Sequence, residues 1–134
     1  MLFFNKRLED LTEADIDLLR ANAVSESRVL DFKRELWEGN EKGRKDFLTD
    51  VTALANTLGG HIIIGIDERE GIATELTPVN VSNIEGLIRG LEDSLRANVV
   101  PRLTDVCFQP ISAPSGDRYL IVQVPKSWNA PHRY

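Results

Sequence analysis

Apolar residues recur at helical spacing in three stretches of this chain, residues 12–23, 42–58 and 82–100. Each stretch also carries a boundary signal. Thr12 precedes acidic residues at the start of the first, Gly59 follows the second, and Pro101 follows the third. The apolar stripes are Ile16, Leu19 and Ala23; Phe47, Val51, Leu54, Ala55 and Leu58; and Ile84, Leu87, Ile88, Leu91 and Leu95. We therefore predict three helices, each with one face toward a core.

Four other stretches have the patterns of β-strands, namely residues 28–34, 61–67, 104–111 and 118–125. The first alternates with period 2, and the second is apolar on both faces, which is typical of a central strand. The order of helix, strand, helix, strand, helix, strand, strand predicts an α+β (mixed α/β) fold. In this fold a central mixed β-sheet is flanked by helices.

Composition and charge narrow the class of protein. The 134 residues include 16 Lys and Arg against 21 Asp and Glu, a net charge of −5. An acidic chain does not coat nucleic acid by bulk charge, so any such contact needs a local basic surface. Cys107 is the single cysteine, which excludes an intrachain disulfide and favours a reducing, cytoplasmic location. The longest aliphatic run, Ile62–Ile64, is far below the ~20 residues of a membrane span, so we expect no membrane partner.

The first candidate site lies on strand 28–34. Asp31 and Lys33 are two residues apart and project from the same face, roughly 6–7 Å apart along the chain. Metal-assisted phosphodiester hydrolysis needs a carboxylate that holds a divalent ion and a cation that stabilises the phosphorane. The alternative interpretation is an ordinary surface ion pair.

A second candidate is Asp67, at the end of strand 61–67. Gly65 lies on the same face and leaves a space beside the carboxylate, which suits a ligand, a metal ion or another backbone. The alternative is that Asp67 only begins the turn predicted at residues 68–71. Sites built on His or Cys are not indicated, because two His and one Cys show no ligand spacing.

Basic residues form the third candidate site. Cations bind phosphate backbones, and aromatic faces stack on unpaired bases. Three of these cations begin the helix predicted at 42–58, where the helix dipole disfavours positive charge. A solvated charged face is the alternative. The candidate nucleic-acid-binding residues are Lys33, Arg34, Lys42, Arg44, Lys45, Arg69 and Lys126, the last beside Trp128.

Several motifs resemble the Schlafen AlbA_2 family. They are ESRVLDFK at residues 26–33, ALANTLGGHIIIGID at 53–67, and VQVPKS at 122–127, with Pro131 and His132 beyond them. The resemblance implies a leader helix over residues 1–24 and an AlbA_2-like domain over 25–134, truncated from a longer protein. It also implies a nucleic-acid-binding, specifically DNA-binding, module of a larger bacterial protein that resembles a transcriptional regulator.

The same resemblance implies an alternative function, RNA cleavage. In animal members the domain belongs to a nuclease fold with three acidic residues, which correspond by motif position to Glu26, Asp31 and Asp67. Three converging carboxylates repel one another unless a cation is bound, which suggests Mg²⁺ or Mn²⁺ held by these residues. Lys33 would then face the scissile phosphate. Asp31 departs from the family, which more often has Glu there, and cleaving members pair two such domains.

A third hypothesis is a non-catalytic domain for assembly or sensing, for example as a homodimer. Its polar residues would then have only structural roles.

Overall fold

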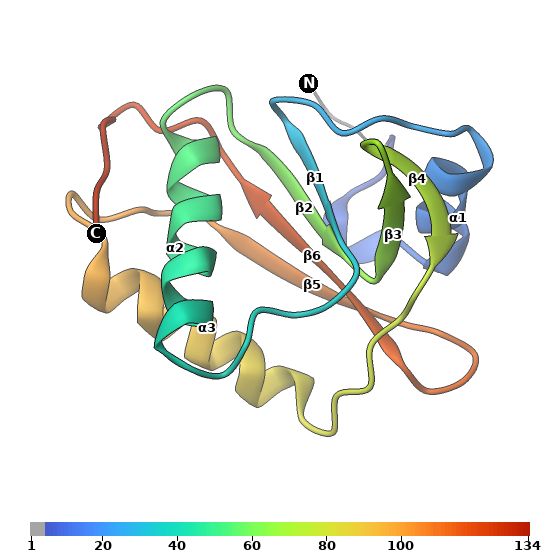
Figure 1. Ribbon diagram of the computed structural model, residues 1–134. Helices are drawn as coiled ribbons and strands as arrows, with labels where there is room; N and C mark the ends of the chain where they lie inside the picture. Colours follow the sequence, from blue (N-terminus) through green and yellow to red (C-terminus); the bar gives the residue numbers. More distant parts are fainter. Residues whose placement is uncertain (1–4) are drawn as a thin grey trace.

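A four-stranded mixed sheet runs through the molecule in the strand order β1-β2-β6-β5 (Figure 1). In this computed structural model, which describes residues 5–134, β1 and β2 are parallel and the other neighbours are antiparallel. A separate antiparallel hairpin consists of β3 and β4. The strands are β1 Leu30–Lys33, β2 Gly60–Ile64, β3 Ile66–Arg69, β4 Ile72–Leu76, β5 Cys107–Ser112 and β6 Arg118–Val124. The predicted α+β fold with a central mixed sheet is confirmed.

Helices cover both faces of this sheet (Figure 1). Two of them, α2 (Glu41–Ala55) and α3 (Ile84–Asn98), pack on one face. On the other face lie α1 (Glu13–Ala21) and the β3–β4 hairpin, preceded by the short 3-10 helix η1 (Leu8–Asp10). All three predicted helices are present. No helix of the described residues combines the length and apolar character needed to cross a bilayer.

The central strand β2 packs against both layers. The Ile62 and Ile64 side chains lie in the core beneath α2 and α3, whereas Ile63 lies in the core with α1. All three side chains are fully buried. The two-sided apolar pattern predicted this central position, and the structure confirms it. On β1, Leu30 and Phe32 are buried in the α1 layer. Their neighbours on that strand therefore face α2.

The predicted single strand 61–67 is wrong at Gly65, where the chain leaves the sheet. Gly65 has φ +108°, which favours glycine. Its N–H donates to the Lys33 carbonyl at 2.8 Å, and its carbonyl accepts from the Thr77 N–H at 2.7 Å. Beyond it, residues 66–69 pair with the return strand β4, which the sequence pattern did not indicate.

The space predicted beside Asp67 is also occupied. A Cβ atom on Gly65 would lie 2.6 Å from Cδ1 of Tyr119, a residue with no exposed surface. The Tyr119 hydroxyl donates to Glu13 Oε2 at 2.6 Å and so ties α1 to the sheet. The glycine therefore accommodates this ring, and the interpretation of Gly65 as a ligand space is incorrect.

Candidate functional site

Asp31 and Lys33 project from β1 toward α2, on the same face as predicted. The Lys33 ammonium lies 3.3 Å from Asp31 Oδ2 and 3.1 Å from Asp50 Oδ2. These side chains are only 26–34% exposed. Burial alone would lower the pKa of Lys33, but the two carboxylates outweigh it and raise this pKa above its ordinary value. Lys33 is therefore a firmly charged ammonium between two carboxylates.

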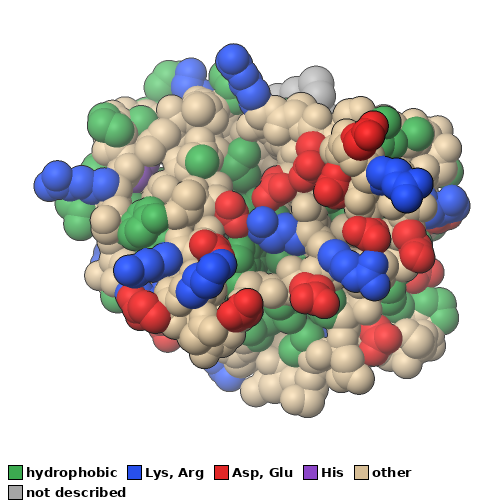
Figure 2. All heavy atoms as spheres, in the orientation of Figure 1, with side chains coloured by type: hydrophobic (Ala, Val, Ile, Leu, Met, Phe, Trp, Pro, Cys, Tyr) green, Lys and Arg blue, Asp and Glu red, His purple; other side chains and the backbone are tan. Residues whose placement is uncertain are grey.

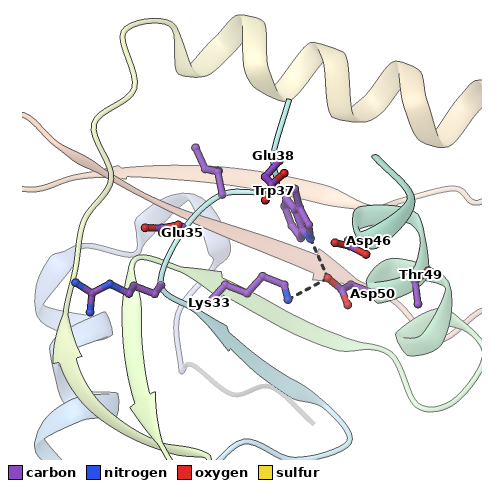
Figure 3. A pocket seen from close by; sticks show the side chains of 9 residues that line it. Lys33, Glu35, Trp37, Glu38, Asp46, Thr49 and Asp50 are labelled. Atoms are coloured by element: carbon purple, nitrogen blue, oxygen red, sulfur yellow. Dashed lines mark hydrogen bonds and ion pairs between the residues drawn. The ribbon is translucent and has the colours of Figure 1, made fainter. Parts of the chain in front are cut away.

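Trp37 completes this group. Its Nε1–H donates to Asp50 Oδ2 at 2.8 Å, and its ring packs edge-on against Phe47, with 4.8 Å between the ring centroids. Figure 3 shows Lys33 and Trp37 reaching Asp50 from two directions. They line an open cavity of about 380 Å³, which also has Arg34 in its wall.

Asp50 and Trp37 were not among the predicted site residues. Asp50 follows the buried Phe47 by three positions on α2, so the spacing of the stripe placed it beside the core face. No sequence signal connected it to strand β1.

Glu26 approaches the same group from the segment before β1. Its Oε2 accepts the Phe32 N–H at 2.9 Å, and its own N–H donates to the Gly71 carbonyl at 2.6 Å. Burial raises the pKa of Glu26 above its ordinary value, and hydrogen bonding and repulsion from Asp31 raise it further. The Glu26 and Asp31 carboxyl groups therefore crowd one another. Together with Asp50 they line a second cavity of about 550 Å³.

Asp67 is not one of the residues that line this second cavity. It lies on β3 next to a bulge between Asp67 and Glu68. There its Oδ2 accepts from Arg34 Nη1 at 2.8 Å and its Oδ1 accepts the Glu68 N–H. Across residues 5–134, no three His, Cys, Asp or Glu side chains are arranged to hold a metal ion. The structure thus brings together Glu26, Asp31 and Lys33, whereas Asp67 is engaged by Arg34.

The predicted basic residues are distributed over several elements. Lys42 pairs with Asp46 at 2.8 Å, and Arg44 pairs with Glu41, along the first turns of α2. Figure 2 shows acidic and basic side chains interleaved over this face, with a group of acidic side chains above β1. The remaining predicted cations, Lys45, Arg69 and Lys126, are exposed and have no ion pair with a described residue.

A family model described as "Schlafen, AlbA_2" matches residues 26–134. The chain belongs to the Schlafen AlbA_2 family. Helix α1 lies outside the matched residues, although its Ile16 and Leu19 side chains are part of the same core as β1. No curated protein matches this AlbA_2 chain.

Two solved structures resemble this AlbA_2 domain. One is the N-terminal domain of a Nitrosomonas europaea protein described as related to the ATP-dependent DNA helicase RecG. It has a TM-score of 0.60 and 24% identity, and the match covers 91% of this chain and 74% of that one. The other is the DIP2311 protein of Corynebacterium diphtheriae, with a TM-score of 0.47 and 20% identity. That match covers 86% of this chain and 25% of that one. The first likeness supports the assignment of the fold.

Proposed function

We propose that this AlbA_2 domain is a nucleic-acid-binding module, and that its binding surface is centred on Lys33. The proposal is carried by the placement of this ammonium, which stays charged where β1 meets α2. Asp50 lines both adjoining cavities, and each cavity has an arginine in its wall, Arg34 in one and Arg28 in the other. Three cations on these adjoining cavities offer contacts to phosphates, which are the main source of affinity for nucleic acid. The name of the Nitrosomonas neighbour, which refers to a DNA helicase, also supports the proposal.

The acidic surroundings do not exclude this function. Exposed ion pairs such as Lys42 with Asp46 contribute only ~0–1 kcal/mol, so a phosphate displaces the carboxylate at low cost. The same carboxylates keep the affinity modest. We therefore expect weak binding that depends steeply on salt.

The direct test is fluorescence anisotropy with labelled single-stranded DNA, duplex DNA and structured RNA, at salt concentrations of about 50 and 200 mM. Affinity is expected to fall steeply over this range, because each neutralised phosphate releases counterions. Arg28→Gln and Arg34→Gln should each weaken binding and reduce the salt slope by about one unit. Arg96→Gln is the matched control, because Arg96 is an exposed arginine on α3 outside both cavities. Equal affinities for all three variants and the wild type would contradict the proposal.

One observation favours a second function, divalent-metal-dependent cleavage of RNA. Glu26 and Asp31 form a crowded carboxyl pair whose repulsion a cation would relieve. Magnesium in proteins is often held by one or two carboxylates, with water and substrate phosphate completing its shell, so this pair fits the ion. When bound there, the ion would supply Lewis-acid activation of a phosphodiester. Lys33 would orient the phosphate from beside Asp31.

A cleavage assay on structured RNA with and without Mn²⁺ tests this second function. Glu26→Gln and Asp31→Asn should abolish cleavage while the circular dichroism spectrum stays unchanged. Asp67→Asn separates the two arrangements of the site, because a three-carboxylate site requires Asp67 and a two-carboxylate site does not. Equal cleavage by wild type and every variant would identify a contaminating nuclease.

The role within a larger bacterial transcriptional regulator rests on the family resemblance and is part of the same proposal. A regulator reads sequence, so selection of a particular duplex from a random pool would support this role. Equal binding to all sequences would contradict it.

A further inference from the structure

The segment after β6 projects an indole ring into solvent. Trp128 is 88% exposed, the highest value among the large hydrophobic side chains of the described residues. A tryptophan ring gains a large hydrophobic stabilisation from burial, and exposed aromatic rings often mark binding surfaces. The exposure of Trp128 therefore points to a contact with another molecule.

The backbone on both sides of this ring is anchored. The Ser127 N–H donates to the Ala55 carbonyl at 3.1 Å. The buried His132 donates from Nδ1 to the Pro101 carbonyl at 2.6 Å, because a carbonyl only accepts. Its Nε2 shares a hydrogen bond with the Ser127 hydroxyl. Asn56, the residue after α2, pairs its side-chain amide with the backbone N–H and carbonyl of His132. These bonds hold the loop in place while its indole ring stays in solvent, so the ring is presented ready for contact.

A cation accompanies the ring. Lys126 Nζ lies 5.1 Å from the Trp128 ring centroid, and this lysine has no ion pair with a described residue. A base stacked on the free face of the indole would place its phosphate within reach of an ammonium. Aromatic rings combined with cations are the usual elements of surfaces that bind single-stranded nucleic acid.

This surface adjoins the cavity of Glu26 and Asp31. Lys126, Gly60 and Val29 line a cavity of about 330 Å³. Arg28 and Thr57 are adjacent in sequence to Val29 and Leu58 of that cavity, and they line the Glu26–Asp31 cavity. In Figure 1 the loops before β1, after α2 and after β6 meet at one end of the sheet. A single strand of nucleic acid bound at Arg28 would therefore have the cavity lined by Lys126 next to it.

We propose that Trp128 and Lys126 form a stacking platform for an unpaired base of single-stranded nucleic acid. The inference rests on the proposed nucleic-acid-binding function and adds the form of nucleic acid that the surface takes. Bases of a duplex are already stacked on one another, so a single exposed indole discriminates in favour of a strand whose bases are free.

The test compares Trp128→Ala, Trp128→Phe and the wild-type chain in titrations with a short labelled oligothymidylate and with a duplex of the same length. Loss of one stacked base corresponds to roughly 5- to 150-fold in Kd, so Trp128→Ala should bind the single strand at least about fivefold more weakly. Trp128→Phe should retain most of the affinity for the single strand. The affinity of both variants for the duplex should stay within about twofold of the wild-type value. Leu18→Ala is the matched control, because it truncates another exposed hydrophobic side chain, on α1.

Intrinsic fluorescence supplies a second readout. The single strand should quench the emission of the wild-type chain, and this quenching should be smaller in Trp128→Phe, in which Trp37 is the remaining tryptophan. If Trp128→Ala binds the single strand as tightly as wild type, the platform is overturned, although salt-dependent binding by the wild type still supports the proposed function. If the wild type binds neither nucleic acid, both proposals fail. A dimer in sedimentation velocity that Trp128→Ala abolishes would instead assign the ring to contact with a second copy of the chain.

Discussion

Substitution of Gly65 by alanine tests how the chain leaves the sheet between β2 and β3. Two costs combine at this position. The backbone angle of +108° is strained for any residue with a Cβ atom and costs about 1–3 kcal/mol. The new Cβ would also lie 2.6 Å from Cδ1 of Tyr119, a ring that is fully buried and fixed by its hydroxyl to Glu13. Overpacking of this kind adds about 1–3 kcal/mol, so the free energy of unfolding should fall by roughly 2–6 kcal/mol.

Urea unfolding followed by circular dichroism measures this loss, and two other glycines separate its parts. Gly116→Ala carries the backbone strain alone, because Gly116 has φ +93° and nothing within 4 Å of the added Cβ. Gly90→Ala carries neither cost, since Gly90 is exposed within α3, and it should stabilise the protein by about 1 kcal/mol. If Gly65→Ala is no more destabilising than Gly116→Ala, the close approach of Tyr119 to Gly65 is refuted.

Three further substitutions or titrations test the site and the core. Trp37→Phe removes the N–H donor to Asp50 but keeps an aromatic ring. The free energy of unfolding in urea should therefore fall by about 1–2 kcal/mol, and an unchanged value would contradict this hydrogen bond. Asp31→Asn should lower the pKa of Glu26 toward its ordinary value in an NMR titration, because one source of repulsion is removed, whereas an unmoved pKa would argue against the crowded pair. Burial lowers the pKa of His61 below its ordinary value of 6.5, so the unfolded chain takes up a proton at a higher pH than the folded one. The free energy of unfolding should therefore be constant above about pH 6.5 and fall as the pH drops through the lowered pKa, and His61→Asn should flatten this dependence.

Much of the fold was predictable because the periodicity of apolar residues directly reflects the faces that become buried. Ile62, Ile63 and Ile64 show this most clearly, since a strand that is apolar on both faces can only lie between two layers. The break at Gly65 was hidden for the opposite reason. Ile66 continues the apolar run, and the requirement for glycine at position 65 comes from its backbone angle and from the ring of Tyr119, which is distant in sequence. Strand β4 was missed because only Ala73 among its residues is buried.

The site was predictable only within one strand. Strand geometry placed Asp31 and Lys33 on one face, and the structure agrees. The partner Asp50 comes from a helix whose rotation over the sheet is set by packing, which spacing along the chain does not encode. For Asp67 the resemblance grouped its carboxylate with the other acids, whereas in the structure Asp67 lies beside a bulge in β3 and pairs with Arg34.

The charges around Lys33 connect the two proposed functions. Asp31 and Asp50 flank the Lys33 ammonium, and Glu26 lies beside Asp31, so a phosphate that approaches Lys33 meets more carboxyl groups than cations. A divalent cation on the carboxyl pair would offset that excess of negative charge, and by thermodynamic linkage nucleic acid and cation would each strengthen the binding of the other. Mg²⁺ should then tighten nucleic-acid binding when ionic strength is held constant, although screening by added salt acts in the opposite direction.

Anisotropy titrations of wild type and Asp31→Asn with and without Mg²⁺ measure this coupling. Tighter binding in Mg²⁺ that Asp31→Asn abolishes would place nucleic acid and cation at one site, whereas an equal response of both proteins would show that the acidic group takes no part in binding.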